Sequence, residues 1–423
     1  MIVRREIVDY FREYENVEIK AIERELKVPL KSDFIISIIG PRRAGKTYYL
    51  LLLRNYLKKS LYLNFEDTRL LNATYKDLRE IIRIFIELYG RKPEYLLLDE
   101  IQNVNGWENI VRELYDLQKY KMFITGSSSK LLSKEIATKL RGRTLSFTLL
   151  PFSFREFLKF KDIDIHSLTM DDEAKIRNYL MEYLQFGGFP DVVKNVEKLH
   201  ILREYSDLIL FRDFIERHNI KNISVARGIH QYILQNFAKE ISIMKIYNKL
   251  KSANIRASKD SVYNYISKLE DTLFFFFLRK YTKKVHLRES WPKKIYLCDT
   301  GLSRVVRYSE DYGRLMENAV FLEFIRKRNT YPILDVYYFK FPDGEVDFLI
   351  KKGEKISEII QVTYASSKDE VDERETKNLI KAGEEFGCKK LTLITWNYEG
   401  VERKNNTRIN CIPLWKWLLK EIL

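Results

Sequence analysis

The stretch from Phe34 to Leu57 combines residue types that can bind phosphate. An apolar run over 34–39 leads into the segment Gly40-Pro-Arg-Arg-Ala-Gly-Lys-Thr47, and an apolar, helix-forming segment follows it. A buried strand, a G-x-x-x-x-G-K-[ST] loop and a helix in this order are typical of a phosphate-binding loop. The glycines let the backbone approach phosphate closely, and the N–H groups of the loop and of the helix N-terminus attract an anion. The sequence therefore predicts that ATP binds at Gly40, Pro41, Arg42, Arg43, Ala44, Gly45, Lys46, Thr47 and Tyr48.

Two acidic residues end a second apolar strand, Glu94-Tyr-Leu-Leu-Leu-Asp99-Glu100. In phosphoryl-transfer sites of this kind, a loop hydroxyl and an acid at the end of the neighbouring strand hold the metal ion. We assign Thr47 and Asp99 to Mg²⁺, Lys46 to the β- and γ-phosphates, and Glu100 to polarising the attacking water. The alternative is a strand end with two solvated acids, which is not expected at this place after a phosphate-binding loop.

Hydroxyl groups and arginines further along the chain are candidates for the same site. Residues 121–129 are typical of a strand that ends in hydroxyls, where Thr125 or Ser127 could sense the γ-phosphate; the same hydroxyls would equally cap the next helix. Arg141 and Arg143 follow, and a guanidinium near the γ-phosphate stabilises transition-state charge. We expect one arginine to complete an active site, either in its own chain or across the interface of a homo-oligomer. The alternative is two solvated basic residues on a turn.

Length and composition define the broad class of protein. At 423 residues the chain is long enough for two or three domains, and its 45% of hydrophobic residues can fill their cores. Neither end resembles a signal peptide, and the longest apolar runs are far shorter than the roughly 20 residues of a membrane span. Three scattered cysteines give neither a disulfide framework nor zinc spacing. We expect a cytoplasmic protein without a membrane partner, and the net charge of +15 favours nucleic acid as a partner.

Residues 31–150 alternate between predicted strands and helices, including a helix over 101–119, which indicates a parallel α/β sheet. The motifs GPRRAGKT, LLLDE, ITGSSS, LRGRT and LLPFSFREF occur in this order, and YLQFGGFP (183–190) and FRD (211–213) follow. Together they resemble the prokaryotic, archaeal-type AAA+ P-loop ATPase family that carries a C-terminal restriction-nuclease-like domain. The resemblance covers nearly the whole chain. It implies a AAA+ ATPase core in residues 1–150 and a helical lid in residues 151–220.

Residues 221–300 follow a different pattern. Two helices, 242–250 and 258–270, are separated by a turn and followed by two strands with a basic loop between them, which predicts a winged helix. Residues 241–300 contain thirteen Lys or Arg and five Asp or Glu, more than half of the excess positive charge of the chain. Winged helices also dock proteins, but this charge favours DNA. The predicted DNA contacts are Lys259, Asn264 and Lys268 on the second helix, and Lys283, Lys284 and Arg288 on the wing.

Residues 301–423 form another predicted α/β unit, which resembles the restriction-nuclease core. That core places a glutamate on a helix, an aspartate on a strand, and E-x-K on the neighbouring strand. The matching residues here are Glu317, Asp347 and Gln361. Gln361 is a poor metal ligand, and Thr363 stands where the lysine would be. We therefore expect a degenerate site that cuts DNA poorly or not at all, unless Lys340 on the preceding hairpin strand reaches across to supply the charge.

These patterns predict an α/β protein with four parts: a AAA+ parallel-sheet domain, a helical lid, a winged helix and a C-terminal restriction-nuclease-like domain. We expect it to hydrolyse ATP with Mg²⁺ and to bind or remodel DNA. Two other functions stay open. A signalling-type NTPase switch would hydrolyse ATP slowly and gate the binding of a partner, whereas an ATP-regulated, Mg²⁺-dependent DNase would cleave DNA.

Overall fold

The computed structural model describes residues 3–420 except 16, 18, 20, 72, 127–139, 141, 166–168, 285–291, 307–309 and 405–406. The chain divides into two compact units, Met1–Leu150 and Pro151–Leu423. Each unit is built around its own sheet of buried apolar strands. Among the described residues, no helix combines the length and the apolar character needed to cross a lipid bilayer.

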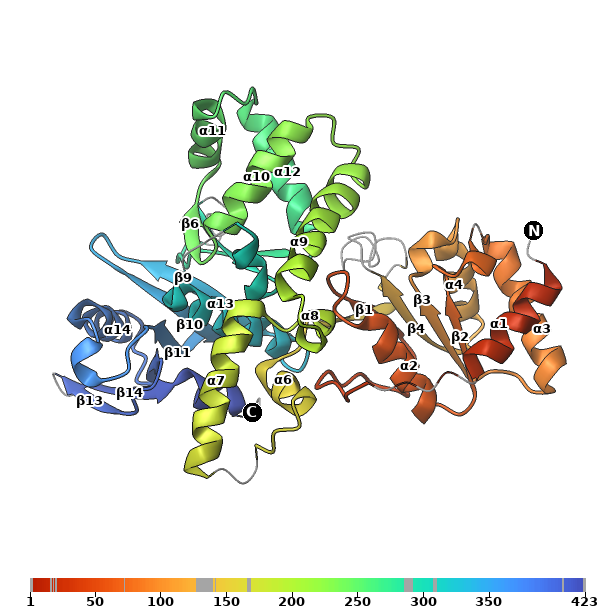
Figure 1. Ribbon diagram of the computed structural model, residues 1–423, viewed down its shortest axis with the longest axis horizontal. Coiled ribbons are helices and arrows are strands. Elements are labelled where there is room, and N and C mark those ends of the chain that lie inside the picture. The colour runs from red at the N-terminus through yellow and green to blue at the C-terminus, as the bar shows by residue number, and fades with distance from the viewer. Residues whose placement is uncertain are drawn as a thin grey trace. The chain divides into compact units, whose positions relative to one another are not determined.

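The first unit is a parallel five-stranded sheet with helices on both faces, coloured red to orange in Figure 1. The strand order is β2-β3-β4-β1-β5, and every neighbouring pair runs parallel. The strands are β1 Ile35–Ile39, β2 Ser60–Asn64, β3 Tyr95–Asp99, β4 Lys121–Gly126 and β5 Thr144–Thr148. The helices are α1 Arg4–Glu15, α2 Lys46–Tyr56, α3 Tyr75–Tyr89 and α4 Trp107–Asp116, with short 3₁₀ turns η1 Thr68–Leu70 and η2 Ile101–Asn103.

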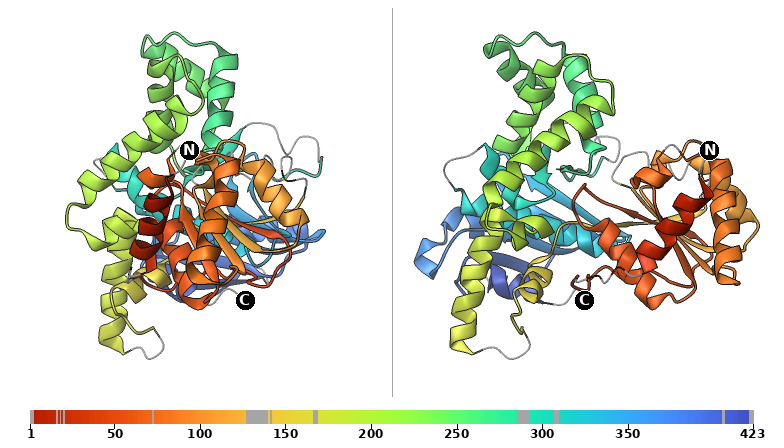
Figure 2. Two further views of the ribbon diagram at one scale, coloured as in Figure 1. Left: turned by 90° about the vertical axis from the view of Figure 1, so that its right-hand side faces the viewer. Right: turned by 45° about the vertical axis from the view of Figure 1, so that its right-hand side comes forward.

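Strand order decides which face of the sheet each helix covers. The crossover through α2 runs from β1 to the far edge at β2, whereas the crossover through α3 returns from β2 to β3. Right-handed crossovers in opposite directions place their helices on opposite faces. Figures 1 and 2 show α2 and α3 on opposite sides of the strands. Because β1 and β3 are parallel, the loop after β1 and the acids after β3 lie at the same edge of the sheet.

The helix predicted over 101–119 is shorter in the structure. Glu100 has a left-handed backbone with φ 51°, residues Ile101–Asn103 form a 3₁₀ turn, and Gly106 has φ 71°. The α-helix itself therefore begins only at Trp107 and ends at Asp116. The apolar spacing that suggested one long helix belongs to a turn followed by a helix. Glu100 lies between the end of β3 and this turn.

The second unit contains a three-stranded antiparallel sheet, a six-stranded mixed sheet and a set of helices. Its first part is helical: α6 Phe154–Phe160, α7 Met170–Phe186, α8 Pro190–Lys194, α9 Lys198–Leu208 and the π-helix η4 Ile209–Glu216. Next come α10 Ile223–Gln235, β6 Lys239–Ile241, α11 Ile243–Ser252, α12 Lys259–Glu270, β7 Phe275–Leu278 and β8 Lys293–Leu297, with the strand order β6-β8-β7. Within this unit, α10, α11 and α12 gather at one end, away from β13 and β14 (Figures 1 and 2).

The six-stranded sheet has the order β13-β14-β12-β11-β10-β9. Its edge pairs β9–β10, β10–β11 and β13–β14 are antiparallel, and its central pairs β11–β12 and β12–β14 are parallel. The strands are β9 Leu334–Lys340, β10 Glu345–Lys352, β11 Lys355–Val362, β12 Leu391–Thr395, β13 Gly400–Lys404 and β14 Thr407–Pro413. The accompanying helices are η6 Thr300–Val305, α13 Tyr312–Arg328, η7 Lys368–Glu370, α14 Glu373–Phe386 and α15 Leu414–Leu419. The predicted α/β class is therefore confirmed in both units.

Candidate functional site

The loop after β1 is shaped by its glycines. A Cβ atom on Gly40 would lie 2.0 Å from the carbonyl oxygen of Leu149, so only glycine fits against the end of β5. Gly45 has φ 96°, a left-handed conformation that glycine adopts without strain, and it precedes the first residue of α2. Arg24 holds the loop from the other side, because its guanidinium donates to the carbonyls of Ala44 at 2.9 Å and Leu150 at 2.7 Å. The loop backbone is therefore fixed before any ligand binds.

Lys46 is the first residue of α2 and is almost completely buried. Its Nζ donates to the carbonyl oxygens of Gly40 and Pro41, at 3.1 Å each, and lies 3.8 Å from Glu100 Oε1. The ammonium therefore lies over the loop, between the backbone that would cradle phosphate and the acid of β3. A phosphate at this loop would meet a desolvated positive charge, which acts more strongly than a solvated one.

The two acids at the end of β3 are also buried and are held by hydroxyl groups. Asp99 Oδ2 accepts a hydrogen bond from the Tyr62 hydroxyl at 2.9 Å, and Oδ1 accepts one from the Thr125 hydroxyl. The Thr125 hydroxyl also accepts the Glu100 N–H at 3.0 Å. Burial, followed by the charge of Glu100, raises the pKa of Asp99 to about 6, although hydrogen bonds from Thr125, Thr47 and Tyr62 oppose the rise. Thr47 and Asp99, predicted as metal ligands, are thus direct neighbours.

The two arginine candidates have different outcomes. Arg141 and the sensor candidate Ser127 lie outside the described residues. Arg143 directly precedes β5, whose first residue pairs with Ile35 at the start of β1, whereas the phosphate-binding loop follows the end of β1. Its Nε donates to Asp116 Oδ1 at 3.0 Å, and its guanidinium lies 5.6 Å from the centre of the Tyr115 ring. Arg143 is therefore at the opposite edge of the sheet from the loop of its own chain.

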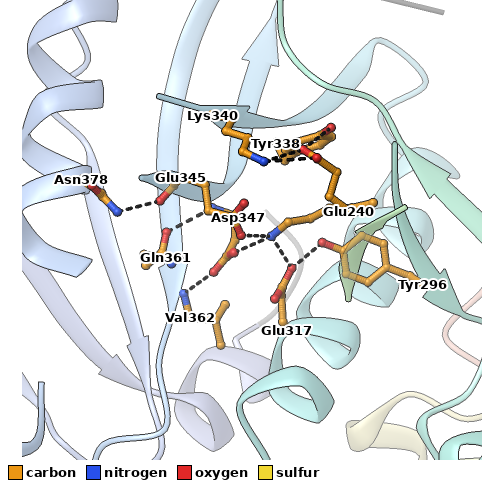
Figure 3. Close-up of polar contacts among 11 residues, drawn as sticks. Glu240, Tyr296, Glu317, Tyr338, Lys340, Glu345, Asp347, Gln361, Val362 and Asn378 are labelled. Atoms are coloured by element: carbon orange, nitrogen blue, oxygen red, sulfur yellow. Dashed lines mark hydrogen bonds and ion pairs between the residues drawn. The ribbon is translucent and has the colours of Figure 1, made fainter. Parts of the chain in front are cut away.

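A second cluster of charged side chains lies in the second unit, where α13, β8 and β10 meet. Figure 3 shows Glu317, Glu345 and Asp347 directed at one point. That point is Lys294 Nζ on β8, which lies 3.0 Å from Glu317 Oε1, 3.1 Å from Glu345 Oε1 and 2.9 Å from Asp347 Oδ1. We call Lys294 and these three acids the carboxylate cluster. It joins the helix glutamate and the strand aspartate that the sequence predicted as a degenerate nuclease-like site.

Gln361 lies beside the cluster without touching the ammonium. Its side-chain oxygen accepts the backbone N–H of Asp347 at 3.1 Å. The other oxygen of the Asp347 carboxylate, Oδ2, accepts the N–H of Val362 at 3.0 Å. Gln361 and Val362 therefore fix the position of Asp347 on its strand.

Known protein families and relatives match most of this chain. The AAA domain family matches residues 32–158, and two domains of unknown function, DUF8612 and DUF4143, match residues 177–311 and 312–417. An uncharacterized protein of Methanocaldococcus jannaschii is 38% identical over 422 residues, covering 96% of this chain and 93% of the relative. An uncharacterized protein of Haemophilus influenzae is 31% identical over 404 residues, covering 92% and 95%.

The chain belongs to the same family as these two proteins. Its members share the full length of the chain, so both units belong to one conserved architecture. The AAA domain and the parallel sheet identify the first unit as that of a nucleotide-hydrolysing P-loop protein. The predicted AAA+ P-loop resemblance is confirmed at this level.

Solved structures give a weaker similarity. The ORC2 protein of Aeropyrum pernix, in complexes with ADPNP and ADP, is 13% identical; the alignment covers 66% of this chain and 88% of that one, with a TM-score of 0.39. The ORC1 protein of the same organism in complex with DNA is 12% identical, with coverages of 72% and 92% and a TM-score of 0.30. At such scores the whole chains do not superpose, so these similarities do not bear on function.

The predicted DNA-contacting residues of this family member are only partly brought together. Lys259 and Asn264 are exposed on α12, and Lys283 and Lys284 are exposed after β7, while Arg288 lies outside the described residues. Lys268 is half-buried, and its Nζ donates to the carbonyl of His218 at 3.4 Å. Lys268 therefore contributes more to internal packing than to the exposed face.

Sequence reasoning missed Lys294, and it proposed Lys340 instead. Lys340 Nζ lies 3.1 Å from both carboxylate oxygens of Glu240 on β6 and does not reach the cluster. Lys294 was counted among the positive charges of the winged helix, but it is 1% exposed and points at acids from a later part of the chain. No spacing rule connects residues 294 and 347. The only local signal was a lysine pair at the start of an otherwise apolar strand.

Proposed function

We propose that this protein hydrolyses ATP with Mg²⁺ at the loop after β1 and uses the reaction to change its hold on DNA. One observation carries the ATPase part: Lys46, Asp99 and Glu100 are all buried at the same edge of the parallel sheet, and Thr125 bridges the two acids. Three buried ionisable groups of this kind are costly unless a charged ligand uses them.

Each side chain has a distinct role in this proposal. The Lys46 ammonium neutralises the β- and γ-phosphates, and the loop N–H groups orient them. Thr47 and Asp99, which are already hydrogen-bonded to each other, would hold Mg²⁺, which supplies charge neutralisation on the phosphate oxygens. Glu100 takes up the proton of the attacking water. Thr125 keeps Glu100 at a fixed distance from Asp99.

The DNA part of the proposal rests on α11, α12 and the strands that follow. The order α10-β6-α11-α12-β7-β8 with a three-stranded antiparallel sheet supports the predicted winged helix. The exposed face of α12 presents Lys259, Tyr263 and Asn264, a cation, an aromatic ring and an amide. Such side chains contact phosphate, sugar and base edges. Lys293 and Lys294 are buried, so the charge available to DNA is smaller than the sequence count suggests.

The test is the ATPase rate without DNA and with duplex, single-stranded and branched DNA. DNA-stimulated, multiple-turnover hydrolysis is expected. The substitution Lys46→Ala should abolish or greatly weaken hydrolysis, and Glu100→Gln should bind ATP without turning it over. A slow rate that DNA does not change, with ADP retained after one turnover, would instead support an NTPase switch. Turnover like that of the wild type in both variants would refute the site itself.

A further inference from the structure

Lys294 fills the centre of the carboxylate cluster. Its side chain comes from β8 and is 1% exposed, and its three nearest carboxylate oxygens belong to Glu317, Glu345 and Asp347 at 2.9–3.1 Å. An ammonium group has three N–H donors and no acceptor. Three donors therefore meet three carboxylate oxygens at hydrogen-bond distance. The coordination of this cation by the protein is complete.

The other polar atoms around the cluster are also paired. Glu317 Oε1 accepts the Tyr296 hydroxyl at 2.6 Å as well as the ammonium (Figure 3). Asp347 Oδ2 accepts the N–H of Val362, and the Asp347 N–H is bonded to Gln361. Glu375 on α14 adds a further carboxylate nearby, and one of its oxygens is buried without a hydrogen bond.

The electrostatics hold the ammonium in its charged form. Burial on its own would lower the pKa of Lys294, but the charges of Asp347 and Glu317 outweigh burial and keep that pKa well above its usual value. Burial and then the charge of Asp347 raise the pKa of Glu317 to about 8, although Lys294 opposes the rise. The Lys294 ammonium is therefore the positive charge that offsets the surplus of carboxylates in the cluster.

A restriction-nuclease-like domain implies Mg²⁺ at this place, and the residues present do not fit it. Mg²⁺ requires near-octahedral oxygen ligands at about 2.0–2.1 Å. Here the oxygens surround a nitrogen, and Gln361, which would take the place of the third carboxylate, binds a backbone N–H instead. Among the described residues, no group of three His, Cys, Asp or Glu side chains fits a metal ion as the side chains now stand, with the ammonium among these acids.

We propose that the Lys294 ammonium permanently takes the place of the metal ion in the carboxylate cluster. The acids then serve a structural purpose: they bind β8 of the three-stranded sheet to α13 and β10. A divalent cation cannot enter while the ammonium is present, because a second positive charge at this distance would be repelled. Removing the ammonium should open the cluster to a metal.

The experiment is Mn²⁺ binding to the full-length, nucleotide-free protein, followed by electron paramagnetic resonance. Wild type and Asp347→Asn should bind Mn²⁺ equally, since any ion they take up lies elsewhere, for instance at Asp99. The substitution Lys294→Ala should gain one Mn²⁺ per chain, and Lys294→Ala combined with Asp347→Asn should lose that ion again. Lys340→Ala, which removes a lysine paired with Glu240 close by, is the matched control and should gain none.

Two results would overturn the proposal. Wild-type Mn²⁺ binding that disappears in Asp347→Asn would show that metal and lysine share the site, and Mg²⁺- or Mn²⁺-dependent DNA cleavage abolished by Asp347→Asn would show the same. A folded Lys294→Ala protein that gains no ion would show that the cluster is not a filled cation site. If Lys294→Ala does not fold, Lys294→Gln, which keeps an uncharged polar side chain one atom shorter than lysine, replaces it. The wild-type comparison with Asp347→Asn is independent of both variants.

Discussion

A single hydroxyl group, that of Thr125, contacts both acidic residues of the nucleotide site. It donates to Asp99 and accepts from the backbone of Glu100, and all three residues are buried. The sequence predicted Thr125 as a γ-phosphate sensor. That role stays a prediction, but the structure adds another one that exists without nucleotide. A γ-phosphate sensor would act only on bound nucleotide, whereas the hydrogen bonds to Asp99 and Glu100 also stabilise the protein without nucleotide.

We predict that Thr125→Val abolishes ATP hydrolysis and also lowers the stability of the nucleotide-free protein. Valine has the same shape but leaves an acceptor and a donor unpaired in a buried place, which costs about 1–3 kcal/mol per group. Thr125→Ser keeps the hydroxyl and is the control. Steady-state ATPase rates and thermal unfolding without nucleotide measure the two effects. If Thr125→Val melts like the wild type, the hydroxyl acts only on bound nucleotide.

Residue by residue, the local motifs were predictable and the long-range partners were not. Lys46, Thr47, Asp99 and Glu100 come from two short segments whose parallel strands must end at the same edge of a sheet. Lys294 and its acids come from separate elements, and their meeting depends on how β8 is placed against α13 and β10. Sequence spacing carries no information on that placement. It therefore suggested Lys340, which is nearer to Asp347 along the chain.

At the scale of elements, two family motifs, which contain Phe152 and Gly188, form one structural junction with Asp299 in the second unit. The N–H of Phe152 donates to the carbonyl of Gly188 at 2.8 Å, and the N–H of Gly188 donates to Asp299 Oδ2 at 2.7 Å. The Tyr183 hydroxyl donates to the carbonyl of Phe152 at 3.0 Å. The motifs that carried the resemblance thus join α6, α7 and η6. Their spacing along the chain could not reveal that contact.

We predict that Gly188→Ala destabilises this junction by at least about 1–3 kcal/mol, the usual cost of overpacking. A Cβ atom at position 188 would lie 2.3 Å from the carbonyl oxygen of Phe152, which is backbone and cannot move aside. Gly313→Ala on α13 is the control, because its Cβ would meet only Asp311 Oδ1 at an ordinary 3.7 Å. Hydrogen exchange of peptides spanning 183–190 measures the change. Equal protection in both variants would contradict the prediction.

The same junction should make stability depend on pH. Burial raises the pKa of Asp299 to about 7, even though the N–H groups of Gly188 and Gly301 oppose the rise. An aspartate in the unfolded chain has a pKa of about 3.9. Between these two values the folded protein holds a proton that the unfolded chain has released, so this residue contributes less stability as the pH rises through that window.

We therefore predict that Asp299→Asn, which cannot titrate, loses most stability relative to the wild type near pH 5 and less near pH 8. Urea unfolding midpoints of both proteins at these two pH values measure the difference. Asp311→Asn, which changes the N-cap aspartate of α13, controls for the general effect of such a substitution. A gap between the two proteins that widens as the pH rises would show that Asp299 is buried as a carboxylate.

At the scale of the whole molecule, the net charge of +15 has to be divided into exposed and buried contributions. Lys259, Lys283 and Lys284 are exposed, whereas Lys294 is buried and paired with the acids of the carboxylate cluster. The sequence predicted the concentration of charge correctly but could not separate lysines that face solvent from those that face acids. Only the exposed ones can release counterions from DNA.

We predict that replacing Lys259, Lys283 and Lys284 by alanine weakens DNA binding and flattens its salt dependence, by up to about 0.9 log units per lost phosphate contact. Lys340→Ala, in which the lost lysine is paired with Glu240, should leave the salt slope unchanged. Fluorescence anisotropy of a labelled duplex over a series of salt concentrations gives both slopes. An unchanged slope in the triple variant would favour a protein as the partner of α12.

The position of Arg143 bears on whether the protein works as an oligomer. It lies at the edge of the sheet opposite its own phosphate-binding loop, held by Asp116 and Tyr115. An arginine at this position can contribute to hydrolysis only at the loop of another copy, because the full length of β1 lies between it and the loop of its own chain. Arg141 lies outside the described residues. The arrangement therefore favours the shared site over the site within one chain.

We predict that specific ATPase activity rises with protein concentration and that inactive variants complement each other. Arg143→Ala, or Arg141→Ala if that residue is the one used, keeps an intact loop, while Lys46→Ala keeps the arginine. Mixing these two inactive proteins should restore part of the activity, because a Lys46→Ala chain can supply its arginine to the loop of an arginine variant. Mixing Lys46→Ala with Glu100→Gln should restore none, since each chain then carries a defective loop or acid of its own. Full activity of Arg141→Ala and Arg143→Ala alone would show that hydrolysis needs neither arginine, and each chain would then be a complete enzyme.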